Sequence, residues 1–191
     1  MGLFDALRGR TPQVAPNLDA LFGISTGALT LESQLDLISS GQAGLCFKSG
    51  SGASEKDNDQ SITDILSVDA ASGHVSLTTD DLGFTWVVIT DADVSSLATR
   101  LHGANATLSD HGYGPRLLCA AFGFLPKVAP GEGEVHMIYL FKRGTWYPFA
   151  AQSDQRRNNE LELRVRSFVG DDLPMEKDLS RWMALWNLPV A

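Results

Sequence analysis

The chain has few cysteines, few basic residues and no long apolar run, and each shortage excludes a class of protein. Its two cysteines, Cys46 and Cys119, are too few for the disulfide framework of a small secreted protein. Both stand in apolar segments, as buried thiols in a reducing compartment do. No segment approaches the roughly 20 apolar residues of a membrane-spanning helix, and no basic-then-apolar signal peptide opens the chain. We therefore expect a cytosolic protein with no integral membrane segment.

Basic residues are outnumbered, with 15 Lys and Arg against 23 Asp and Glu and a formal net charge of −8. A negatively charged surface offers a phosphate backbone little to bind, so nucleic acid is not an expected partner. The composition, 43% apolar and 20% charged, is typical of a globular protein. A chain of 191 residues buries roughly 70% of its unfolded surface and needs no disulfide or metal for stability.

Motifs of known chemistry are missing. Glu55 and Asp57 occupy the positions where a P-loop needs Gly and Ser or Thr, and the four histidines are dispersed without metal-ligand spacing. Cys119, with His136 across a predicted strand pair, is the best nucleophile candidate, but apolar surroundings raise a thiol pKa and favour a core cysteine. We expect no catalytic residues, no cofactor, no metal and no enzyme activity.

Hydrophobic periodicity predicts both strands and helices. Asp93 is expected to cap a helix that ends near Gly112, and Thr30–Ile38 is expected to form a short amphipathic helix. Residues 154–169 fit a helix or an edge strand, and the i,i+4 pairs Glu160–Arg164 and Glu162–Arg166 favour the helix. The strands are predicted from alternation and β-rich runs over residues 43–48, 74–79, 84–90, 117–125, 135–141 and 145–150.

These elements predict an α+β fold with a single antiparallel sheet of about six strands and helices packed mainly on one face. Strand-strand-strand-helix occurs over residues 43–111 and again over 117–169, so a pseudo-duplication is conceivable. The same element order resembles that of YbjN and the type III secretion chaperones. We expect an N-terminal amphipathic nub and linker over residues 1–16, followed by one α+β domain over residues 17–191.

Leu3, Phe4 and Leu7 in the nub fall at helical spacing. A helix this short is marginal in water without a surface to dock on. The three side chains either pack on their own domain or contact a partner, and we treat them as candidate partner-binding residues.

A predicted hairpin contributes the other candidates, Arg143, Trp146 and Tyr147, because aromatic residues and Arg are enriched at binding hot spots. The alternative is that the aromatic rings belong to the core. A final helix over Glu176–Trp186 would place Leu179, Trp182, Met183 and Trp186 on one side, where they either cover their own sheet or form a homodimer surface.

Six segments spread from end to end share the pattern of one family: Met1–Leu7, Asn17–Phe22, Gly44–Lys48, Gly83–Val88, Gly112–Cys119 and Tyr139–Phe149. In them the chain resembles the PspA-associated protein PspAB. The resemblance implies an accessory protein of the phage-shock membrane-stress system that associates with PspA, a coiled-coil, membrane-remodelling protein. It implies no enzyme activity and no catalytic residues.

The leading hypothesis is a cytosolic adaptor that binds a helical, PspA-like partner through an apolar groove or a sheet edge, with peripheral membrane contact through that partner. The alternative is a chaperone-like or small-ligand-binding homodimer, by analogy of element order alone.

Overall fold

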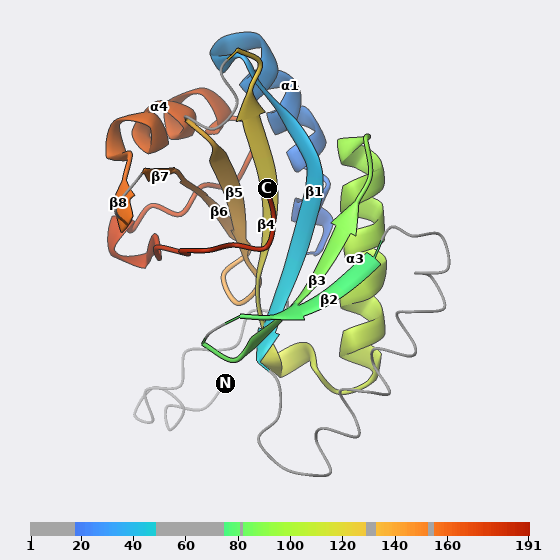
Figure 1. The fold of residues 1–191 in the computed structure, drawn as a ribbon. Helices are drawn as coiled ribbons and strands as arrows, with labels where there is room; N and C mark the ends of the chain where they lie inside the picture. The colour runs from blue at the N-terminus through green and yellow to red at the C-terminus, as the bar shows by residue number, and fades with distance from the viewer. Residues whose placement is uncertain (1–17, 49–74, 81, 129–132, 153–154) are drawn as a thin grey trace, which may run out of the picture.

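The computed structural model describes residues 18–48, 75–80, 82–128, 133–152 and 155–191, so the predicted nub over residues 1–16 lies outside the described part. Six strands form one antiparallel sheet in the order β2-β3-β1-β4-β5-β6 (Figure 1). This arrangement confirms the predicted α+β fold. The strands are β1 (Leu37–Lys48), β2 (Val75–Thr79), β3 (Phe84–Thr90), β4 (Leu117–Pro126), β5 (Val135–Leu140) and β6 (Thr145–Phe149).

Strand pairing differs between the two halves of the chain. The strand β1 pairs with β3 and leaves β2 at one end of the sheet, whereas β4, β5 and β6 follow one another. The element order alone does not test a duplication of the two halves, which stays a prediction. The β2–β3 turn is the predicted hairpin: Asp80 Oδ1 accepts hydrogen bonds from the backbone N–H groups of Leu82 and Phe84, and Gly83 has a φ of +80°.

Within the described residues three α-helices accompany the sheet: α1 (Ile24–Leu35), α3 (Val94–Asp110) and α4 (Asn159–Val169). Asp93 caps α3 as predicted, since its side chain accepts a hydrogen bond from the Ser96 N–H. The prediction of a helix over Thr30–Ile38 is wrong at both ends. The helix begins six residues earlier, at Ile24, and the left-handed Asp36 ends it, so Ile38 already belongs to β1.

The helices pack against one face of the sheet (Figure 1). In Figure 1, α1 and α3 lie behind the strands, and α4 contacts both α1 and β6. Apolar side chains at alternating strand positions point toward them, because successive residues of a strand face opposite sides of the sheet. This main core joins side chains of all three helices to the sheet, among them Ile24, Leu31, Leu97, Leu101, Val165, Leu45, Phe122, Tyr139 and Trp146.

The opposite face of the sheet is covered by the C-terminal segment, residues 177–191, drawn in red across the front of the strands in Figure 1. The predicted helix over Glu176–Trp186 is wrong: only a short 3-10 turn forms, at Leu179–Arg181. Trp182 is buried against the sheet while Leu179 and Met183 are exposed, so the predicted apolar stripe does not exist. The segment buries its tryptophan by crossing the sheet in an irregular conformation.

Two glycines let the C-terminal segment lie close to the sheet. A Cβ atom at Gly123 in β4 would overlap the Ala191 carbonyl oxygen, and one at Gly44 in β1 would come within 2.7 Å of Val190 Cγ2. Side chains of the sheet hold the same end of the chain: His136 Nε2 donates to the Val190 carbonyl oxygen at 2.8 Å. The position of the segment is thus set by residues of β1, β4 and β5.

Candidate functional site

Arg143, the exposed member of the predicted hairpin site, lies in the β5–β6 turn. Its Nε donates to Glu176 Oε2 at 2.6 Å, and the Thr145 hydroxyl donates to the same oxygen at 3.1 Å. The Asp178 N–H donates to the other oxygen, Oε1. The side chain of Glu176 is almost fully buried by these partners, whereas 44% of the Arg143 side chain remains exposed. Arg143 therefore anchors the start of the C-terminal segment and still presents a cation to the surface.

The carboxylate of Glu176 is held in its charged form by this arrangement. Burial acts to raise its pKa, but the hydrogen bonds from Asp178, Arg143 and Thr145 outweigh it and lower the pKa below the ordinary glutamate value. A buried, charged carboxylate that accepts three hydrogen bonds from its own chain acts as a structural anchor.

Trp146 and Tyr147, the two aromatic candidates, are both buried. Trp146 faces the helices, and its Nε1 donates to the Ala20 carbonyl oxygen. Tyr147 faces the opposite side, where its hydroxyl donates to the Met183 carbonyl oxygen and its ring stacks on Trp182 with centroids 6.1 Å apart. The hairpin therefore places its three candidates in three different environments, and neither ring lies on the surface. Leu3, Phe4 and Leu7 lie outside the described residues.

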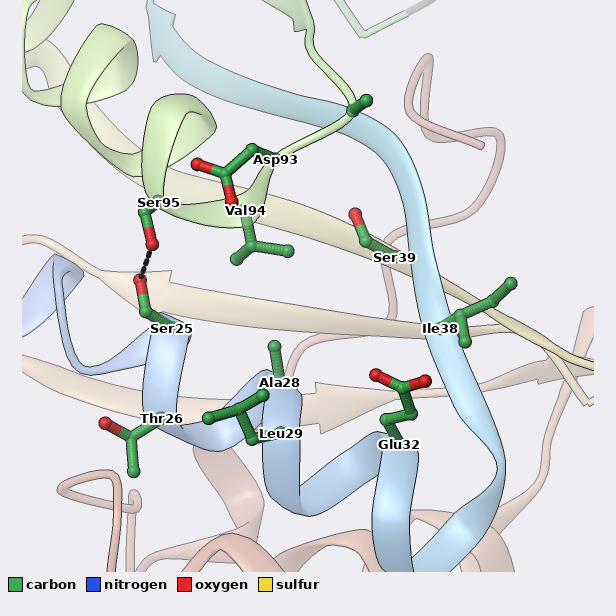
Figure 2. Close-up of a pocket in the computed structure, with 11 residues that line it drawn as sticks. Ser25, Thr26, Ala28, Leu29, Glu32, Ile38, Ser39, Asp93, Val94 and Ser95 are labelled. Carbon is green, nitrogen blue, oxygen red and sulfur yellow. Dashed lines mark hydrogen bonds between the residues drawn. The ribbon is translucent and has the colours of Figure 1, made fainter.

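A surface groove is present between α1, the start of β1 and the N-terminus of α3 (Figure 2). Its volume is about 470 Å³. Figure 2 shows Ser25 and Ser95 joined across one end of it by a hydrogen bond of 3.0 Å. We call it the α1–α3 groove, and its walls include Ser25, Leu29, Glu32, Ile38, Asp93 and Val94.

The α1–α3 groove has an apolar wall exposed to solvent. Leu29 is 68% exposed and Ile38 is 38% exposed, and both line the groove. Exposed apolar side chains that gather at one concave place are typical of an interaction site, whereas scattered ones are ordinary.

Sequence reasoning did not single out Leu29, because the predicted helix began after it. Once the helix begins at Ile24, Leu29 falls off the buried face formed by Ile24, Gly27 and Leu31. A leucine on the polar side of an amphipathic helix was the signal available in the sequence.

The rim of the α1–α3 groove is acidic. In Figure 2 the carboxylates of Glu32, on α1, and Asp93, the N-cap residue of α3, lie at the groove. Lys127 Nζ lies 3.1 Å from Glu32 and 4.0 Å from Asp36, so one cation partly offsets the charge on that side. The surroundings of the apolar wall therefore suit a partner with basic residues beside its apolar ones.

Cys119 and His136, the nucleophile and base candidates of the sequence, do not lie opposite each other in the structure. His136 pairs in register with Gly123, whereas Cys119 pairs with Leu140, so the two are four residues apart along the β4–β5 pair. At roughly 3.3 Å per residue this separates them by about 13 Å. Among the described residues, no group of His, Cys, Asp and Glu side chains has the arrangement of a metal site.

In the part of the chain that the structure describes, no helix is long and apolar enough to span a membrane. Fold and surface together define an α+β protein in which one sheet is covered by helices on one side and by its own C-terminal segment on the other. A family model described as PspA associated protein B matches residues 1–190, and the chain belongs to that family. No curated protein and no solved structure matches it.

Proposed function

We propose that the chain is a non-enzymatic accessory protein of the phage-shock membrane-stress response that binds a PspA-like coiled-coil partner. The observation that carries the proposal is the family match over residues 1–190, because the family is named for association with PspA. Under this proposal the protein is cytosolic and reaches the inner face of the membrane through its partner.

The α1–α3 groove is the proposed contact surface. An amphipathic helix binds a groove by inserting apolar side chains spaced at i, i+3, i+4 and i+7. The exposed wall at Leu29 and Ile38 offers such side chains an apolar surface. The negative charges of Glu32 and Asp93 at the rim would attract basic residues of the partner helix on either side of its apolar stripe. Arg143, exposed at the far hairpin, is retained as a candidate contact of the same partner.

Co-purification with a PspA-like protein from the native cytosol tests the proposal. Tagged wild-type chain is compared with Leu29→Asp, which places a charge in the groove wall, and the recovered proteins are identified by mass spectrometry. Leu29 is largely exposed, so the substitution costs the folded state little. We expect the wild type to recover a coiled-coil protein and Leu29→Asp to lose most of it.

The matched control is Leu163→Asp, which makes the same substitution at an exposed leucine of α4, away from the groove. Retention of the partner by Leu163→Asp and its loss in Leu29→Asp would assign the contact to the groove. Equal retention by both would move the contact elsewhere, and Arg143→Glu then tests the hairpin. If the wild type recovers nothing but further copies of itself, the homodimer alternative replaces the adaptor.

A further inference from the structure

Cys46 and Cys119 lie directly opposite each other in the two central strands of the sheet. They are register partners in the antiparallel β1–β4 pair, and both side chains belong to the apolar cluster on the face under the C-terminal segment. Both are free, buried thiols that face the same side of the sheet. The two sulfur atoms are therefore neighbours, although 72 residues separate them in the sequence.

Directly opposite residues of antiparallel strands suit a disulfide bond. Their Cα atoms are about 4.5 to 5.5 Å apart, within the range of about 4.4 to 6.8 Å that disulfides span. The two cysteines can therefore be bridged by side-chain rotation, with little movement of either strand.

The C-terminal segment is the cover over this pair. Tyr147 lies near Cys119, whose charge when ionised helps burial to raise the pKa of the tyrosine, and Trp182 stacks on Tyr147. Trp186 packs edge-on against Phe149 at 5.2 Å on the same face. Residues 177–191 form no strand with the sheet. Sheet side chains such as His136 and Tyr147 instead donate hydrogen bonds to backbone carbonyl oxygens of the segment. A cover held in this way opens at a lower free energy than the sheet beneath it.

We propose that Cys46 and Cys119 form a reversible disulfide when the C-terminal segment lifts from the sheet and admits a peroxide. One thiolate attacks hydrogen peroxide, which gives a sulfenic acid and hydroxide. The second thiol then attacks that sulfur, forms the S–S bond and releases water. Two electrons pass from the thiols to the peroxide in total, and a dithiol reductant reverses the reaction by thiol–disulfide exchange.

The closed structure protects the thiols from this reaction. The hydrogen bond with Cys119, burial, and the charges of Cys119 and Asp80 all raise the pKa of Cys46 above the ordinary thiol value. Since the thiolate is the reactive form, a covered pair reacts slowly and an uncovered pair reacts faster.

Peroxide treatment of the reduced, full-length protein tests the site. We expect both thiols to disappear together, the linked peptides that contain Cys46 and Cys119 to lose two hydrogens (about 2 Da) without gaining oxygen at the sulfur of either cysteine, and a dithiol reductant to restore both thiols. In Cys46→Ser and Cys119→Ser the intramolecular bond cannot form, so the remaining thiol should gain oxygen or form mixed disulfides. If the wild-type thiols oxidise independently of each other, or form only disulfides between chains, the proposal is overturned.

The role of the cover is tested with Gly123→Ala, whose added methyl group would displace Ala191, against Gly103→Ala, whose Cβ meets nothing within 4 Å. We expect oxidation to be about tenfold faster in Gly123→Ala, the change that a 1.4 kcal/mol loss of docking free energy produces, and unchanged in Gly103→Ala. Trp186→Ala, which removes packing and adds no atoms, should also accelerate it if Gly123→Ala does not fold. Equal rates in all of the folded variants would overturn the gating.

Discussion

Replacement of Glu162 by alanine is expected to be the most damaging single change to a polar side chain of this protein. Glu162 lies on α4 and is 2% exposed. Its Oε1 accepts hydrogen bonds of 2.9 Å from the Ala150 N–H and from Arg157 Nε. Arg157 in turn donates through Nη1 to the Trp182 carbonyl oxygen and lies over the Phe149 ring. One carboxylate thus connects α4 to the end of β6 and to the C-terminal segment.

The size of the effect follows from burial. Removing one partner of a buried ion pair leaves an uncompensated charge and costs about 3 to 5 kcal/mol. The buried Ala150 N–H also loses its acceptor, which adds about 1 to 3 kcal/mol unless water replaces it. The two contributions together come to about 4 to 8 kcal/mol. Because water can reach Arg157, whose side chain is 20% exposed, we expect the lower end of this range, about 4 kcal/mol.

Urea denaturation followed by tryptophan fluorescence measures the change. The control is Glu32→Ala, which breaks the exposed ion pair with Lys127 and should cost less than about 1 kcal/mol. Glu162→Gln keeps an acceptor for one donor and should fall between the two variants. A loss of less than 1 kcal/mol in Glu162→Ala would refute the reasoning, because the carboxylate would then not be the buried link that the structure shows.

Three further changes are expected to act through burial and hydrogen bonding. Burial lowers the pKa of His136 below its ordinary value of 6.5, despite the hydrogen bond to Val190. The unfolded state therefore binds the proton first, and the free energy of unfolding should fall as the pH drops below 6.5. Denaturation at several pH values measures this slope, to which His136 should no longer contribute in His136→Gln. Trp146→Ala should cost about 3 to 5 kcal/mol in urea denaturation, because its ring is fully buried. Asp80→Ala removes three hydrogen bonds, including that from Trp86 Nε1, and should lower the melting temperature by several degrees in a calorimetric scan.

The sheet and the helices α3 and α4 were predictable from local signals, whereas the predicted helix over Thr30–Ile38 missed the start of α1. Alternating apolar residues located every strand of the sheet, although the structure extends β1 back to Leu37. Asp93 and the Asp80–Gly83 turn were located by residue types that have a specific backbone role. These signals are short-range, so the sequence carries them without knowledge of the partner strands.

The misplaced features depend on long-range packing. Glu162 was paired with Arg166 by i,i+4 spacing, but the structure buries it against Arg157. The helical spacing of apolar residues in the C-terminal segment was real, but an apolar sheet face can bury Trp182 without a helix. Gly44 and Gly123 make that close approach feasible, and nothing near them in the sequence reveals the segment that lies over them.

The sequence did not locate the α1–α3 groove. The hypothesis of an apolar groove or a sheet edge that binds a helical partner stays a prediction, and the groove is one surface on which it can be tested. Trp146 and Tyr147 were candidates because aromatic residues serve both cores and interfaces, and local sequence does not separate the two roles. Their burial under the helices and under the C-terminal segment depends on the whole fold.

The central claim, that the α1–α3 groove binds a helical partner, is tested most directly by titrating the purified chain with a purified PspA-like coiled-coil protein in a calorimeter. We predict saturable binding that weakens at least about tenfold in Leu29→Asp, as expected for a buried apolar anchor, and is unchanged in Leu163→Asp. Equal affinities in the wild type and Leu29→Asp, or no binding by the wild type, would contradict the account.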